Sequence, residues 1–140
     1  MSFTDNTTGE YEHVTPQRLF DELNEEFHFT VDVCATKELA KCQKYYDKKS
    51  NGLIQDWSGE TVWCNPPYGR DIDMWVKKAM YSRATAVLLV PSRTDSRWWH
   101  RYAMTAHEIR FICGRLRFKG AKDGSKFPSS LLIWRNTSNP

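Results

Sequence analysis

Apolar positions recur with a helical period in some segments and form short continuous runs in others. Leu19, Phe20, Leu23 and Phe27 share one face of a predicted helix, which Thr15-Pro16 opens with an N-cap residue and a proline suited to the first turn. Further helices are predicted over residues 37–44, 71–82 and 96–105, and strands over residues 29–34, 61–64, 84–90 and 108–113. Residues 114–118 and 129–135 predict a C-terminal antiparallel hairpin.

Strands that alternate with helices and end in a hairpin predict an α/β sandwich with a mostly parallel central sheet. The polar residues 1–14 predict a flexible N-terminal arm, and residues 15–140 a single domain. Ligands of such sheets bind beyond the carboxyl ends of the strands. Three segments place polar residues at or just past the ends of predicted strands, so we expect the chemistry there: 32–35, 65–68 and 91–93.

Composition narrows the class of protein. The 140 residues suffice for one domain, and 40% hydrophobic with 26% charged residues exclude wholesale disorder. No apolar run approaches the roughly 20 residues of a membrane helix, and no secretory signal opens the chain, so a cytoplasmic protein without membrane contact is expected. Four cysteines without metal-ligand spacing predict free thiols and no metal. A net charge of +3 permits a nucleic-acid partner.

The most informative segment is Asn65-Pro66-Pro67-Tyr68, at the end of a predicted strand. The prolines stiffen the corner and push the residue before each of them towards extended geometry. The carbonyl groups of Asn65 and Pro66 can then accept the two hydrogens of a planar exocyclic amine whose ring stacks on Tyr68. Such orientation makes a poorly nucleophilic aromatic amine reactive. The alternative is a stiff loop or a polyproline ligand for a partner protein.

Beyond this corner, an ordered set of motifs runs from residue 15 to residue 134. It comprises Thr15-Pro16, Val31-Asp32-Val33-Cys34-Ala35, Gly52-Leu53 with Asp56-Trp57, Trp63-Cys64-Asn65-Pro66-Pro67-Tyr68-Gly69, Trp75, Lys78-Ala79, Leu89-Val90-Pro91-Ser92-Arg93-Thr94-Asp95, Trp99-His100, Gly114-Arg115-Leu116-Arg117-Phe118 and Phe127-Pro128-Ser129. The set resembles the small phage-type DNA N6-adenine methyltransferases of the Dam family, whose amino-methyltransferase motif IV is [D/N]-P-P-[Y/F]. The resemblance implies a Rossmann-like class I methyltransferase sandwich, S-adenosyl-L-methionine as cofactor, and double-stranded DNA as partner. It also implies a phage origin and the host bacterial cytoplasm.

The resemblance further implies roles for individual residues. Methyl transfer to the N6 amine of a flipped-out adenine would fall to Asn65, Pro66, Pro67 and Tyr68. Cofactor binding would fall to Thr15 and Pro16 near the methionine part, Asp32 at the ammonium with Cys34 and Ala35, Asp56 at the adenine with Trp57, and Asn65. The basic residues expected at DNA are Arg93, Arg115, Arg117, Lys119, Lys122 and Lys126.

Three departures from the family pattern stand out. Residues 32–36 carry no glycine-rich turn, Asp47 is the one weak candidate for the ribose-binding acid, and no separate target-recognition domain is present. Sequence specificity is therefore low or rests on the basic loop.

Two other functions remain open at this point: methyl transfer to an amine or amide in RNA or protein, and a non-catalytic nucleic-acid-binding module. Asp32 and Arg93 also suit structural ion pairs, and Asp56 suits a turn.

Overall fold

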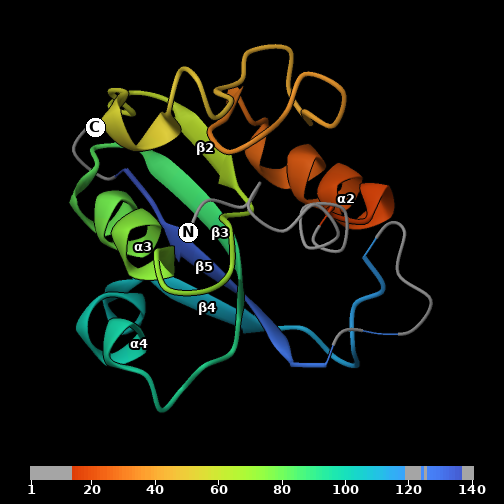
Figure 1. The fold of residues 1–140 in the computed structure, drawn as a ribbon, viewed down its shortest axis with the longest axis vertical. Helices are drawn as coiled ribbons and strands as arrows, with labels where there is room; N and C mark the ends of the chain where they lie inside the picture. Colours follow the sequence, from red (N-terminus) through yellow and green to blue (C-terminus); the bar gives the residue numbers. More distant parts are fainter. Residues whose placement is uncertain (1–13, 119–123, 125, 137–140) are drawn as a thin grey trace.

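The computed structural model of the protein describes residues 14–118, 124 and 126–136 (Figure 1). The helices are α2 (Gln17–Phe27), α3 (Ile72–Tyr81) and α4 (Arg97–Arg101), with 3₁₀ turns η1 (Gly52–Ile54) and η2 (Ala103–Thr105). The strands are β1 (Val31–Asp32), β2 (Thr61–Cys64), β3 (Thr85–Pro91), β4 (Glu108–Phe111) and β5 (Ser129–Trp134). None of the described helices is long and apolar enough to span a membrane.

The five strands form one mixed sheet in the order β1-β2-β3-β5-β4. β1, β2 and β3 run parallel, whereas β5 is antiparallel to both of its neighbours, β3 and β4. The prediction of an α/β protein is thus confirmed. The sheet is mixed: it starts with the predicted parallel pairings of β1, β2 and β3, and β5 then inserts between β3 and β4 and makes the other two of the four pairings antiparallel.

Two apolar clusters lie on opposite faces of the sheet. On one face, α2 packs Phe20 and Leu23 against Trp63 of β2 and against β3 and β5. On the other face, α3 packs Trp75 and its neighbours against alternate residues of the same strands. The alternation follows from the period of two in a strand, which sends neighbouring side chains to opposite faces. The result is a three-layer arrangement (Figure 1).

The predicted first helix is confirmed with a different start. Its N-cap is Pro16, without a side-chain hydrogen bond, and Thr15 lies one residue earlier. Thr15 instead uses its hydroxyl in a tertiary contact, described below. Of the predicted arm over residues 1–14, only Val14 belongs to the described residues, and it is buried.

Residues 37–44 do not form the predicted helix. The chain there turns back so that residues 44–46 run beside β1: the N–H of Tyr46 donates to Asp32 at 2.9 Å, and the N–H of Ala35 donates to Tyr46 at 3.0 Å. These tertiary bonds replace the helical ones and leave too little chain for a helix. The segment covers the edge of the sheet beside β1.

Residues 114–118 are not a strand of the C-terminal hairpin either. β5 pairs with β4, which ends at Phe111, and Gly114 has a φ of +78° that ends extended backbone. The antiparallel pair therefore has a longer connection, residues 112–128, than the sequence predicts.

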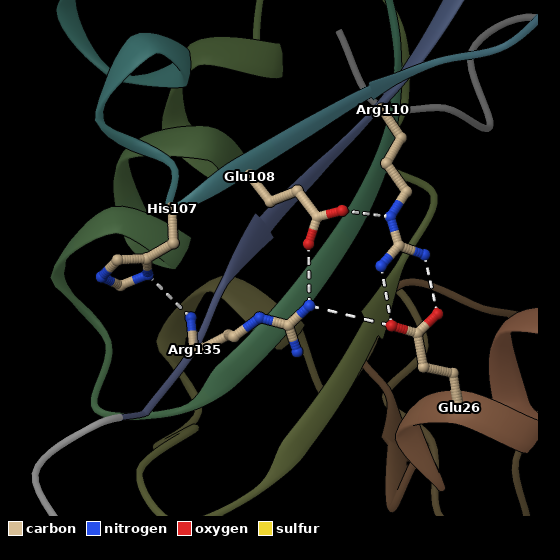
Figure 2. Close-up of polar contacts among 5 residues, drawn as sticks. All are labelled: Glu26, His107, Glu108, Arg110 and Arg135. Carbon is tan, nitrogen blue, oxygen red and sulfur yellow. Dashed lines mark hydrogen bonds and ion pairs between the residues drawn. The ribbon is translucent and has the colours of Figure 1, made fainter.

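Ionic contacts fix the last turn of α2 to the far edge of the sheet (Figure 2). The guanidinium of Arg110 donates two parallel bonds of 2.7 Å to Glu26, and its Nε donates to Glu108 at 2.6 Å. Arg135 joins Glu108 at 2.8 Å, while its backbone N–H donates to Nδ1 of His107 at 2.9 Å. We call Glu26, Glu108, Arg110 and Arg135 the Glu26 network.

Candidate active site

The carboxyl ends of the three parallel strands bring the predicted chemistry together. Asn65 follows β2 directly, and the N–H of Val33, beyond β1, donates to Trp63 of β2 at 3.1 Å. The hydroxyl of Tyr68 donates to the carbonyl of Leu89 in β3 at 3.2 Å. The corner formed by residues 65–68 is therefore fastened to β3, and the chain beyond β1 runs beside the end of β2.

Thr15 fixes the side chain of Asn65. Nδ2 of Asn65 donates to the hydroxyl of Thr15 at 3.0 Å, and Thr15 is 3% exposed. Because Nδ2 is bonded to Thr15, Oδ1 lies on the opposite side of the amide, where it is buried. This arrangement gives the carbonyl oxygen of Asn65 one orientation at the end of β2.

Tyr68 is half-buried beneath two aromatic residues from the C-terminal segment. Its ring meets Phe127 edge-on with centroids 5.5 Å apart, and Phe118 at 6.3 Å. Burial raises the pKa of the Tyr68 phenol well above its usual value, so the hydroxyl is a hydrogen-bond donor rather than a proton acceptor. Arg93 lies over the ring of Phe127 at 5.4 Å. Neither phenylalanine received a role from the sequence, although both belong to the motifs around residues 114–118 and 127–129.

Asp32 lies buried under the loop that follows β1. It is 3% exposed, and its two carboxylate oxygens accept the N–H groups of Cys34 at 3.3 Å and Lys41 at 3.0 Å. Desolvation raises its pKa to about 7, against the opposite effect of these two bonds. Asp32 therefore organises the loop around Cys34 and the buried Ala35.

Residues of this loop line two cavities. The first, which we call the Thr15 cavity, has a volume of about 350 Å³ and is lined by Val14, Thr15, Pro16, Gln17, residues 38–41 and Arg117. The second, the Asn51 cavity, has about 390 Å³ and is lined by Val33, Cys34, Asp47, Lys48, residues 51–53, Pro67, Asp71, Met74 and Trp75. The Asn51 cavity combines apolar walls with the polar side chains of Asp47 and Asn51. A Cβ on Gly52 would lie 2.0 Å from the carbonyl oxygen of Val33, so only glycine allows this close approach.

Comparison with known protein families identifies the family of this chain. The family model described as DNA N-6-adenine-methyltransferase (Dam) matches residues 5–140. The chain belongs to the Dam family. A DNA N-6-adenine-methyltransferase of Escherichia phage T1 is 33% identical over 88 residues, which are 60% of this chain and 37% of the phage protein. The chain thus matches little more than a third of the length of that relative.

Two residues predicted to bind the cofactor of this Dam-family chain lie apart from the corner. Asp56 precedes β2, at the opposite end of the strand from Asn65, and its carboxylate accepts the N–H of Ser58 at 2.9 Å. Trp57 is 2% exposed, and its Nε1 donates to the carbonyl of Gly52 at 2.9 Å. Asp56 borders a separate cavity of about 610 Å³ beside Lys78 and Arg83. The structure does not bring Asp56 and Trp57 together with Asp32 and Asn65, and it gives both of them structural contacts.

Four of the six basic residues predicted to contact DNA are among the residues that the structure describes. Arg93, Arg115, Arg117 and Lys126 are exposed, whereas Lys119 and Lys122 lie outside the described residues. Gly124 folds back on Arg115, since a Cβ there would lie 2.9 Å from that of the arginine. Through Phe118 and Phe127, this segment of the Dam-family chain adjoins Tyr68, so its charges border the corner. Arg117 differs from the others because it lines the Thr15 cavity.

Proposed function

We propose that the protein transfers a methyl group from S-adenosyl-L-methionine to the N6 amine of adenine in double-stranded DNA. The observation that carries this proposal is the Asn65 amide, held by Thr15 at the carboxyl end of β2. Thr15 lines one cavity, and Pro67 of the same corner lines another. Membership of the Dam family and the name of the phage T1 relative support it. The mixed sheet suits the Rossmann-like methyltransferase fold that we propose for residues 15–140 as one domain.

The residues around the two cavities fit the cofactor in their chemistry. The Asn51 cavity offers apolar walls for an adenine and the polar side chains of Asp47 and Asn51 for a ribose. The Thr15 cavity carries acidic and basic side chains suited to an amino-acid group. Cys34 lines the Asn51 cavity, and Ala35 follows it in the loop after β1. When bound, S-adenosyl-L-methionine supplies a methyl group activated on a sulfonium.

The corner acts on the amine of the target base. Oδ1 of Asn65 and the carbonyl of Pro66 accept the two amine hydrogens and turn the nitrogen lone pair towards the donor methyl. Positive charge grows on the nitrogen during transfer, so these acceptors stabilise the transition state more than the ground state. The surplus proton then leaves to solvent, and no general base is required. Pro67 keeps the corner stiff.

The target adenine has to leave the duplex, because its paired amine is bonded to thymine inside the stack. Flipping costs a few kcal/mol, and stacking on an aromatic side chain is worth about 1–3 kcal/mol. Tyr68 is the residue at the corner that supplies such a ring. Arg93, Arg115 and Lys126 supply exposed charges for the phosphates that flank the flipped base.

Identification of the product tests the proposal. The protein is incubated with labelled S-adenosyl-L-methionine and, separately, with unmethylated duplex DNA, single-stranded DNA, RNA and a denatured protein mixture. The substrate is then hydrolysed and the labelled product identified. N6-methyladenine from DNA supports the proposal. Label found in RNA or protein alone, or in a cytosine product, would contradict it. Heat-inactivated protein provides the background.

A further inference from the structure

Three segments far apart in sequence meet at the Thr15 cavity. They are the start of α2 with Thr15 and Gln17, residues 38–41 of the loop after β1, and Arg117 from the C-terminal segment. Three of the side chains are ionisable: Glu38 is acidic, whereas Lys41 and Arg117 are basic. A cavity that holds both signs of charge suits a zwitterion better than it suits a phosphate backbone, which carries negative charge alone.

The two basic side chains of the cavity, Lys41 and Arg117, differ in their polar contacts. Nζ of Lys41 donates to the amide oxygen of Gln17 at 2.7 Å, across the cavity. Arg110 and Arg135, elsewhere in the C-terminal region, are held in the Glu26 network. Arg117 forms no ion pair with any residue in the part of the chain that the structure describes. Its planar guanidinium can bind a carboxylate through two parallel bonds.

The acid at this cavity is Glu38, not the predicted Asp32. Asp32 lies beneath the loop, bonded to the backbone of Cys34 and Lys41, and it is not part of the cavity wall. Glu38 belongs to the wall of the cavity and is exposed to solvent. The predicted role of Asp32 as partner of an ammonium group therefore suits Glu38 better in this structure.

We propose that Arg117 binds the carboxylate of the methionine moiety of the cofactor in the Thr15 cavity, and that Glu38 binds its ammonium. This inference rests on the proposed function, since it names the residues that select the amino-acid end of that cofactor. It moves Arg117 from the predicted DNA interface to the cofactor site. The C-terminal segment would then contribute to cofactor binding as well as to DNA binding.

Calorimetric titration without DNA tests the role of Arg117. The ligands are S-adenosyl-L-methionine, its decarboxylated analogue, and methylthioadenosine, which lacks both the carboxylate and the ammonium. The variant Arg117→Gln should bind S-adenosyl-L-methionine about tenfold to a hundredfold more weakly than wild type. It should bind the decarboxylated analogue and methylthioadenosine as wild type does. The matched control is Arg18→Gln, which removes an exposed charge on α2 outside the cavity.

Glu38→Gln should show the complementary pattern. It should weaken S-adenosyl-L-methionine and its decarboxylated analogue, which both carry the ammonium, and leave methylthioadenosine unchanged. Glu25→Gln, at an exposed position of α2, is its control.

The outcomes separate this inference from the proposed function. One outcome is that wild type binds S-adenosyl-L-methionine while Arg117→Gln lowers the affinity for S-adenosyl-L-methionine and for the decarboxylated analogue by the same factor. In that case the assignment of Arg117 is wrong and the proposed function stands. The same holds if Arg117→Gln weakens DNA binding alone. If folded wild type binds none of the three ligands, both proposals are overturned. Circular dichroism of each variant confirms that it is folded.

Discussion

The two ends of α2 are attached to the sheet by different kinds of interaction. Its start adjoins the corner at the carboxyl ends of the strands, where a neutral bond of 3.0 Å joins Thr15 to Asn65 in a buried setting. Its last turn lies at the other end of the sheet, where Glu26 enters a network of four charged side chains (Figure 2).

The two ends of α2 therefore have different roles: one positions the Asn65 amide, and the other stabilises the fold. The bond at the start of α2 sets the orientation of one amide, beside which positive charge develops only during the reaction. The Glu26 network, well away from that corner, secures the helix against β4 and Arg135. We therefore expect changes at the start of α2 to affect turnover, and changes at its end to affect the free energy of unfolding.

The largest expected effect comes from Asn65→Ala. Removing the acceptor should lower the single-turnover rate of methylation about a hundredfold or more, because that acceptor stabilises charge formed in the transition state. Cofactor affinity and melting temperature should change little by comparison. Rapid-quench measurement with saturating DNA and cofactor gives the rate. A variant that methylates adenine at the wild-type rate would remove this corner from the active site.

Thr15→Val should have the next largest effect. The substitution keeps the shape of the side chain but removes the oxygen that accepts from Nδ2 of Asn65, so the amide can turn and the rate should fall about tenfold. Thr15→Ser restores the hydroxyl and should recover most of that loss. Because Thr15 also lines a cavity, cofactor affinity is measured separately. Equal rates for the Val and Ser variants would show that the bond to Asn65 does not matter for turnover.

The helix and the strand that meet in these two regions were predictable from sequence, but the tertiary contacts between distant residues were not. The apolar spacing of Leu19, Phe20 and Leu23 fixes the inner face of α2, and the apolar run before Asn65 fixes β2. The Thr15–Asn65 bond spans 50 residues and the Arg110–Glu26 bonds span 84. No periodicity in a single sequence encodes contacts of that separation.

The elements that were predicted wrongly have the same physical cause. Residues 37–44 have helical spacing, but the backbone on either side of them is held by tertiary hydrogen bonds. The N–H of Ala35 donates to the carbonyl of Tyr46, and the N–H of Tyr46 donates to the carbonyl of Asp32. Basic residues in the C-terminal segment were grouped as one DNA-binding set because charge is visible in a sequence. Their division between a cavity wall, an aromatic ring and open surface becomes visible only after folding.

Arg110→Met tests the other end of α2. It removes the paired bonds to Glu26 and the bond to Glu108, and should lower the free energy of unfolding by about 1–2 kcal/mol, since these side chains are partly exposed and water screens them. The methylation rate at 25 °C should stay near that of wild type. Urea unfolding measures the change, with Arg18→Met, which breaks only an exposed pair within α2, as the control. A large loss of rate without loss of stability would contradict the division of roles.

A smaller expected effect is a pH dependence at the Glu26 network. Bonds from Arg110 and then Arg135 lower the pKa of Glu108 to about 2, below the value of roughly 4.3 in an unfolded chain. The stabilisation by Glu108 is therefore present above about pH 4.3 and is lost as the pH falls towards 2. The difference in unfolding free energy between wild type and Glu108→Gln should shrink over that range and stay constant above it. A constant difference from pH 2 to pH 5 would show that the network does not shift this carboxyl.

The stability of the loop after β1 should depend on pH in the opposite sense, because Asp32 is buried beneath it. Burial raises its pKa to about 7 in the folded protein, against roughly 3.9 in an unfolded chain. Between these values the folded state holds a proton that the unfolded state has released, so the contribution of Asp32 to stability is largest below about pH 3.9 and is lost as the pH rises towards 7. Asp32→Asn cannot ionise, and the stability of wild type relative to this variant should therefore decline from pH 4 to pH 7. Urea unfolding at intervals across that range, with Glu108→Gln measured in parallel, gives the comparison. If the relative stability rises instead, the N–H groups of Cys34 and Lys41 outweigh desolvation, and Asp32 is a carboxylate held by the loop throughout.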